Sequence, residues 1–110
     1  MDNPVVRLES LIKEYNEKID ESIDFGIKKA EAENVYRKAL SLYLAEKVLA
    51  GNKVTVLGDM ARGEPEIADL RLERDKYTVL YEATQERIFA LRTEIRITET
   101  NLKLDYGRTN

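Results

Sequence analysis

Residues 67–102, IADLRLERDKYTVLYEATQERIFALRTEIRITETNL, decide the fold of this chain. A spacing of three and four residues runs through them unbroken for five heptads, which is typical of a coiled-coil seam. Its eight apolar members are predicted to form an oligomer seam: Ile67, Leu70, Tyr77, Tyr81, Ile88, Leu91, Ile95 and Leu102. The polar members Arg74, Thr84 and Thr98 either set the register or lie at the seam edge in water. Val79, Leu80 and Ala83 widen the apolar face, which indicates more than one neighbouring helix.

The first half of the chain shows the helical period less strictly. Asn3-Pro4 supplies an N-cap and a proline at the first helical position, and Gly51-Asn52 supplies a C-terminal stop, so a helix is predicted over 4–50. Its predicted apolar stripe comprises Val5, Leu8, Ile12, Tyr15, Ile19, Ile23, Ile27, Ala30, Val35, Ala39, Leu42 and Leu49. Gly26 is either a tolerated glycine, costing about 1 kcal/mol, or the mark of a kink or a close helix contact. A complete break at Gly26 would give three helices instead of two.

Residues 51–64 are predicted to form a connector with one helical turn over 56–61, capped by Thr55 and flanked by Gly58 and Gly63. Glu64-Pro65 then opens a second long helix, predicted over 65–104 and followed by a polar tail at 105–110. The chain is thus predicted to be a single all-α domain over 1–110, a long antiparallel helical hairpin that resembles a coiled coil. Because two helices leave much apolar surface in water, we expect a homodimer that completes a four-helix bundle.

The connector is longer than a simple link between two helices requires, which suggests a task for the tip of the hairpin. Its candidate partner-binding residues are Val54, Val56, Leu57, Met60 and Arg62. Either the apolar members fold over the end of the bundle and cap its core, or they stay exposed and anchor a protein partner. In the second case Asp59, Arg62 and Glu64 would form a polar rim.

The composition excludes several kinds of chemistry. The sequence contains no cysteine and no histidine, which removes disulfides, thiol nucleophiles, Cys/His zinc sites and imidazole catalysis. It also lacks a glycine-rich phosphate loop with the lysine that such a loop requires. We therefore expect a protein that is not an enzyme, with no catalytic, cofactor-binding or metal-binding residue and no cofactor.

The charge pattern does not favour nucleic acid as the partner. The net charge is −3, and no segment is strongly basic. The alternative is a nucleic-acid contact through Arg92, Arg96 and Lys103 of the second helix. Glu94 and Glu99 stand close to these residues in the sequence and argue against such a contact. No apolar run is long enough to span a membrane, and the N-terminus lacks the pattern of a signal peptide. A cytoplasmic protein without membrane contact is expected.

The stretch VTVLGDMARGEPEIADLRLERDKYTVLYEATQERIFALRTEIRITET, at 54–100, resembles short helical-hairpin proteins of bacteriophages and prophages. The resemblance extends over about residues 40–104 and rests on the turn and the heptad pattern. It implies a phage-encoded protein acting in the host cytoplasm, and it implies no catalytic activity. Taken together, the expected function is a homo-oligomeric protein-interaction module, most simply a dimer, that binds a protein of DNA metabolism or host defence. The alternative is a nucleic-acid-binding accessory protein.

Overall fold

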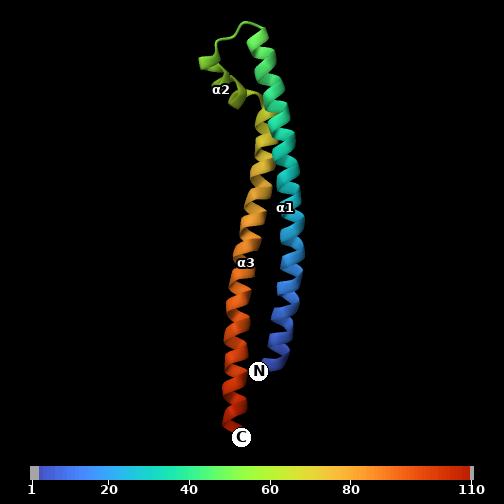
Figure 1. Cartoon of the computed structure of the whole chain (residues 1–110), viewed down its shortest axis with the longest axis vertical. Coiled ribbons are helices and arrows are strands. Elements are labelled where there is room, and N and C mark those ends of the chain that lie inside the picture. The colour runs from blue at the N-terminus through green and yellow to red at the C-terminus, as the bar shows by residue number, and fades with distance from the viewer. Residues whose placement is uncertain (1–2, 110) are drawn as a thin grey trace. The chain divides into compact units, whose positions relative to one another are not determined.

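The computed structural model describes residues 3–109 and, among these, the side chains of residues 3–107. This part of the chain contains three helices and no strand, so the all-α class is confirmed. The helices are α1 (Pro4–Leu49), α2 (Val54–Gly63) and α3 (Pro65–Thr109), shown in chain order in Figure 1.

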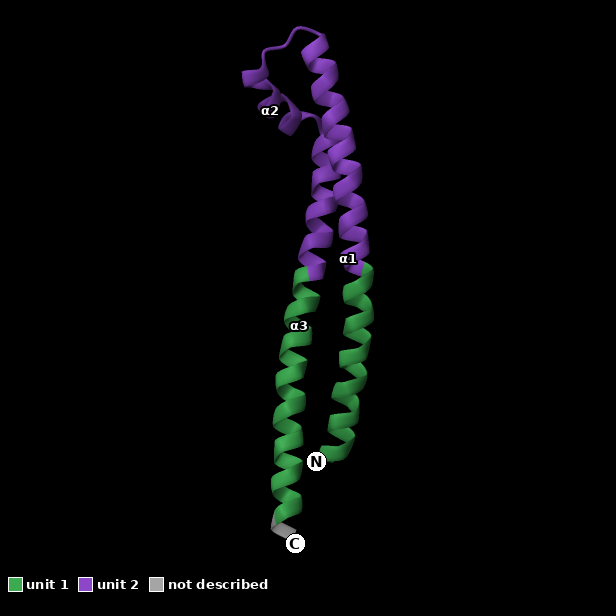
Figure 2. Cartoon of the chain, viewed as in Figure 1, with its two compact units in different colours: residues 1–24, 82–110 green, residues 25–81 purple. Residues whose placement is uncertain are grey.

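The two long helices form a hairpin that divides into two compact units. Unit 1 comprises residues 1–24 and 82–110, and unit 2 comprises residues 25–81, which include α2. Within each unit, α1 and α3 lie side by side and antiparallel (Figure 2). The two units share both long helices, and the single domain expected over residues 1–110 stays a prediction.

Both ends of α1 are set by local hydrogen bonds. At its start, the backbone N–H of Val5 donates to the Asn3 side-chain oxygen at 2.8 Å, which is the predicted N-cap. At its end, Gly51 adopts a φ of 88°, a left-handed conformation that favours glycine. The Asn52 backbone and side-chain amides both donate to the Lys47 carbonyl, at 3.1 and 3.0 Å. The helix therefore stops at Leu49, one residue before the predicted end.

Gly26 lies inside an unbroken helix. A Cβ placed there would lie 3.4 Å from Cε2 of Tyr81, so the small residue lets the tyrosine ring pack closely against the α1 backbone. The close helix contact considered from the sequence is therefore present. The division into three long helices at this position does not occur.

The connector is more regular than the sequence predicts. It contains a helix of ten residues, α2, where a single turn over 56–61 is expected. Thr55 lies within this helix and does not cap it; the N-cap is Lys53, which makes no side-chain capping bond. Gly58 lies inside the helix rather than at a bend. The helix ends because Glu64, which precedes a proline, is extended at ψ 119°.

Helix α3 continues beyond its predicted end at residue 104. It runs to Thr109, so residues 105–109 of the predicted polar tail are helical, and Asn110 lies outside the described residues. The polar composition of the tail suggested an end to the helix. However, proline is absent from it, and Gly107 alone lowers helix stability by only about 1 kcal/mol.

The predicted seam of α3 forms the inner face of the hairpin. Ile67, Thr84, Ile88 and Leu91 are buried, and the other seam positions are half-buried: Leu70, Arg74, Tyr77, Tyr81, Ile95, Thr98 and Leu102. Thr84 is thus an interior residue rather than an edge residue in water. The face is covered by α1 of the same chain in each unit, and its role in joining two chains stays a prediction.

The predicted apolar stripe of α1 is largely wrong. Most of its members are exposed: Val5, Ile12, Ile23, Ile27, Ala30, Val35, Leu42 and Leu49. The residues that turn inward instead recur every three or four positions, and include charged and polar side chains: Leu8, Leu11, Tyr15, Lys18, Ser22, Phe25, Lys29, Glu33, Tyr36, Leu40, Tyr43 and Lys47. The aliphatic residues on the outside of α1 are therefore largely exposed to solvent.

Candidate protein-interaction surfaces

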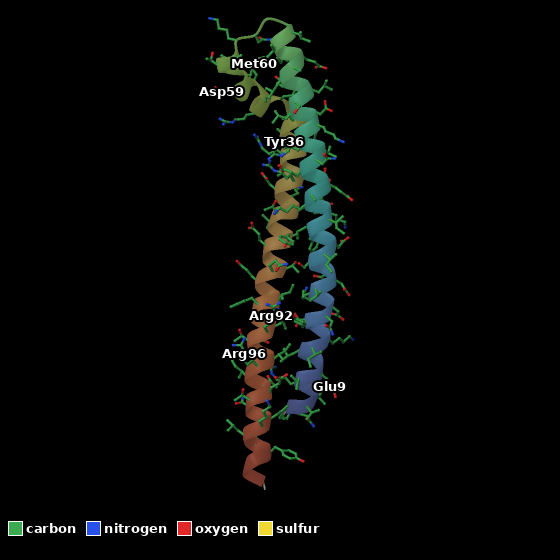
Figure 3. The ribbon with its side chains drawn as sticks, viewed as in Figure 1. Glu9, Tyr36, Asp59, Met60, Arg92 and Arg96 are labelled. Atoms are coloured by element: carbon green, nitrogen blue, oxygen red, sulfur yellow. The ribbon has the colours of Figure 1, made fainter. Side chains whose placement is uncertain are left out.

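The tip of the hairpin contains both buried and exposed residues, and its role stays a prediction. Leu57 is buried and Met60 is half-buried, as the capping role requires. Val54, Val56 and Arg62 are exposed. Asp59 and Met60 are neighbours on α2 (Figure 3), and the Asp59 carboxylate lies 3.6 Å from the Arg62 guanidinium.

Ala61 is a core residue of α2 that the sequence reading missed. It is as deeply buried as Leu57. Its position four residues after Leu57, on the same side of a helix, is the signal that could have identified it. The buried side of α2 thus holds Leu57 and Ala61, and Val54, the first residue of the helix, is exposed.

One side of unit 2 is an open apolar surface, called the open face below. Helix α1 contributes Lys28, Glu31, Ala32 and Val35, and α3 contributes Asp69, Leu70, Leu72, Glu73, Asp75, Lys76, Tyr77, Val79 and Leu80. Three shallow grooves cover it. The first groove lies between the two helices, and the other two lie along α3. The first groove shares Glu73 and Tyr77 with the second, and the second shares Leu72, Lys76 and Leu80 with the third. The grooves are therefore continuous.

The apolar side chains of the open face are well exposed to solvent. Val79 is 64% exposed and Leu72 is 53% exposed, and the groove that contains them has an almost wholly apolar lining. The sequence pointed to Val79 and Leu80 as a widened apolar face with a further neighbour. It did not identify Leu72, which lies outside the seam of α3, and it assigned Val35 to the inward stripe of α1 rather than to an open surface.

The interior of unit 2 is held by contacts between cations and tyrosines. The Arg74 guanidinium lies 4.5 Å from the ring centroid of Tyr36 (labelled in Figure 3), and the Lys29 ammonium lies 5.2 Å from that of Tyr81. Arg74 also pairs with Asp75 at 3.0 Å and Glu33 at 3.4 Å. Desolvation opposes the charge on Arg74, but the hydrogen bond to Asp75 and both carboxylates outweigh it and raise the arginine pKa.

In unit 1 a bidentate ion pair joins the two long helices. Nε and Nη2 of Arg87 each donate to a carboxylate oxygen of Glu14 at 2.8 Å. Glu94 also lies against Arg87, at 3.5 Å. The hydrogen bond from Arg87 is the main reason why the pKa of Glu14 lies below its ordinary value.

A second surface of unit 1, called the lateral face below, carries the predicted basic residues. Helix α3 contributes Phe89, Arg92, Arg96, Glu99 and Lys103, and α1 contributes Ile12, Tyr15, Ile19 and Ile23. Arg92 joins the two helices, because its guanidinium lies 5.9 Å from the Tyr15 ring centroid and donates to the Tyr15 hydroxyl at 3.3 Å. Gln85 makes a second contact between the two helices, because its side-chain amide donates to the Ser22 hydroxyl.

The cations of the lateral face are not neutralised by carboxylates. Among the described side chains, no ion pair involves Arg92, Arg96 or Lys103. Glu94, which stands close to them in the sequence, pairs instead with Arg87. Figure 3 shows Arg92 and Arg96 one turn apart on α3.

Within the described residues, no cluster of three or more potential metal ligands occurs, and no helix has the length and apolar character required to cross a bilayer. Comparison with known protein families, with curated proteins and with solved structures gave no significant match. The resemblance to phage proteins therefore stays a prediction. The open face, the lateral face and the tip are the surfaces from which a function can be argued.

Proposed function

We propose that this protein is a non-enzymatic helical interaction module that acts as a dimer and binds another protein. The open face of unit 2 is the observation that carries the proposal. Leu72, Val79 and Leu80 lie in adjoining grooves in water, although a neighbouring helix would remove them from it. Contiguous apolar surface of this kind is typical of a binding site.

A second copy of the chain is the occupant that fits the open face best. A two-fold axis brings the same surface of both copies together, so the surface must complement itself. The open face contains two cations, Lys28 and Lys76, and four anions around its apolar residues: Glu31, Asp69, Glu73 and Asp75. Two copies related by a two-fold axis could therefore pair opposite charges while burying Val79 and Leu80. The product would be the predicted four-helix bundle.

Light scattering at micromolar concentration tests the dimer. We expect the wild-type chain to have twice the monomer mass. Val79→Asp should be monomeric, because dimerisation would bury an unpaired carboxylate. Val6→Asp is the matched control, since Val6 is 60% exposed and lies outside the open face; this variant should remain a dimer. A monomeric wild type, or a dimeric Val79→Asp variant, would contradict the proposal.

Nucleic-acid binding is the second candidate function, and the basic side chains of the lateral face favour it. Arg92, Arg96 and Lys103 have no carboxylate partner among the described side chains, and Phe89 beside them could stack on a base. Phosphate contacts would make the affinity fall steeply with salt. Titration of single-stranded and duplex DNA between low and moderate salt tests it.

The biological setting belongs to the proposal and is supported by the sequence resemblance alone. A phage-encoded protein in the host cytoplasm, with a target in DNA metabolism or host defence, is the setting that we propose. Measurement of binding to purified candidate targets, rather than further study of the isolated chain, would test it.

A further inference from the structure

We propose that the lateral face of unit 1 binds an acidic, amphipathic helix of a partner protein. This inference rests on the proposed function as a protein-interaction module, and it specifies the chemical class of the partner. It concerns a different surface from the open face, so the two proposals can fail separately.

The first support is the periodicity of the lateral face. Phe89, Arg92, Arg96, Glu99 and Lys103 follow one another at intervals of three, four, three and four residues, so they form a stripe along α3. On α1, Ile12, Ile19 and Ile23 lie beside Tyr15, which contacts Arg92. Two parallel stripes of this kind match the way in which a helix packs lengthwise on two others.

The second support is the charge of the stripe. Its charged members are three cations and one anion, which leaves two positive charges within a chain whose net charge is −3. The Tyr15 ring holds Arg92 in place without neutralising it. The nearby carboxylate of Glu94 is occupied by Arg87. A local positive surface on an acidic protein favours acidic partners.

The third support is the exposed apolar surface between the charges. Phe89 is 72% exposed, and Ile12 and Ile23 are also exposed. An apolar anchor surrounded by cations matches an amphipathic helix with an apolar stripe and acidic flanks. Nucleic acid is a poorer match, because the isoleucines offer no ring for a base to stack on and Glu99 would face the phosphates.

Selection from a displayed library of helical peptides tests the inference. The probe is the wild-type chain, and the library varies charge and apolar spacing independently. We expect enriched peptides to carry Glu or Asp beside an apolar residue at every third or fourth position. An enriched set that is neutral or basic, or the absence of any enrichment, would overturn the proposal.

Affinities of the selected peptides then locate the site. Arg92→Gln/Arg96→Gln should weaken binding by about tenfold or more, and Phe89→Ser should act similarly. The matched control is Arg37→Gln/Lys38→Gln, which removes two exposed cations of unit 2 and should leave the affinity unchanged. Equal losses in both double variants would show a nonspecific charge effect and overturn the assignment.

Parallel titrations separate this partner from other anions. The competing probes are single-stranded DNA and anionic phospholipid vesicles. If either bound through Arg92 and Arg96 with a higher affinity than the selected peptides, the choice of a protein partner would be overturned. Light scattering on the same samples reports the dimer independently. A monomeric chain that still binds acidic peptides would refute the dimer and retain the lateral face, and a dimer that binds none would do the reverse.

Discussion

The two units of the hairpin use the same pair of helices in different ways. Unit 1 closes on aliphatic residues, among them Leu11, Ile88 and Leu91, and Leu91 is 0% exposed. In unit 2 the residues with a similar degree of burial are Leu57, Ala61 and Ile67, two of which belong to α2. Between the long helices of unit 2, the contacts include half-buried cations against tyrosine rings.

The difference shows which part of the chain has apolar surface available for a partner. On the inner face of unit 1, the buried aliphatic side chains leave little apolar surface for a further partner to cover. In unit 2, the pairs of Arg74 with Tyr36 and of Lys29 with Tyr81 keep the helices together while Leu72 and Val79 stay outside. We therefore expect unit 1 to be the more stable by itself and unit 2 to gain more from a second copy.

Leu91→Ala should have the largest effect on stability. Removal of a fully buried leucine side chain leaves a cavity and costs about 2–5 kcal/mol. Chemical denaturation measures the loss, and Ile97→Ala, at an exposed position of the same helix, is the control and should lose far less. If the two variants lost equal stability, unit 1 would not have the closed core described here.

Leu57→Ala should have a smaller effect, about 2 kcal/mol, because a short helix can shift to fill part of the space. Val54→Ala at the exposed first residue of α2 is the control and should change stability by less than about 0.5 kcal/mol. Hydrogen exchange should show the lost protection in unit 2. Unchanged stability in Leu57→Ala would mean that α2 does not cap the end of the helix pair.

Gly26→Ala should stabilise the chain by about 0.5–1 kcal/mol. Alanine has a higher helix propensity than glycine, and its Cβ would lie at an ordinary contact distance, 3.4 Å, from the Tyr81 ring. Gly26→Leu should instead destabilise the chain, since its longer side chain must displace that ring. Thermal melting of both variants measures the two effects, and stabilisation by leucine would refute the close packing of Tyr81.

The smallest effect concerns the pH dependence of the ion pair in unit 1. The hydrogen bond from Arg87 lowers the pKa of Glu14 below its ordinary value of 4.5, and desolvation only partly opposes this. The pair therefore stabilises the folded chain above pH 4.5, and its contribution is lost as the pH falls through the lowered folded-state pKa. Glu14→Gln should reduce the acid sensitivity of unfolding below pH 4.5. Identical profiles for wild type and variant would contradict this.

The sequence predicts the inner face of α3 well and that of α1 poorly, for a physical reason. On α3 the inward stripe is also the most regular apolar stripe, so periodicity alone identifies Ile88 and Leu91. On α1 the inward stripe includes Lys18, Lys29 and Glu33, whereas aliphatic residues such as Ile23 face water. Hydrophobicity favours the wrong side of α1, because tyrosine rings on the inside accept cations as neighbours.

The candidate surfaces are predictable to different degrees. Arg92 and Arg96 were identified from their spacing in the sequence. That Glu94 forms an ion pair with Arg87 rather than with either of them is seen only in the folded structure. The open face was indicated by Val79 and Leu80 on one helix. Its other side, at Ala32 and Val35, depends on how α1 is rotated about its axis. Rotation of a helix with two apolar stripes is set by packing rather than by local sequence.

The turn at Gly51 has a consequence for the order in which the chain folds. Contacts at the turn join residues five positions apart, whereas those of unit 1 join residues 63 to 77 positions apart. Closing the longer loops first would cost more chain entropy than adding pairs outward from the turn. Folding should therefore start near Gly51 and α2 and proceed toward the termini. Substitution of Gly51 should slow folding, while changes near residues 11 and 91 should mainly speed unfolding.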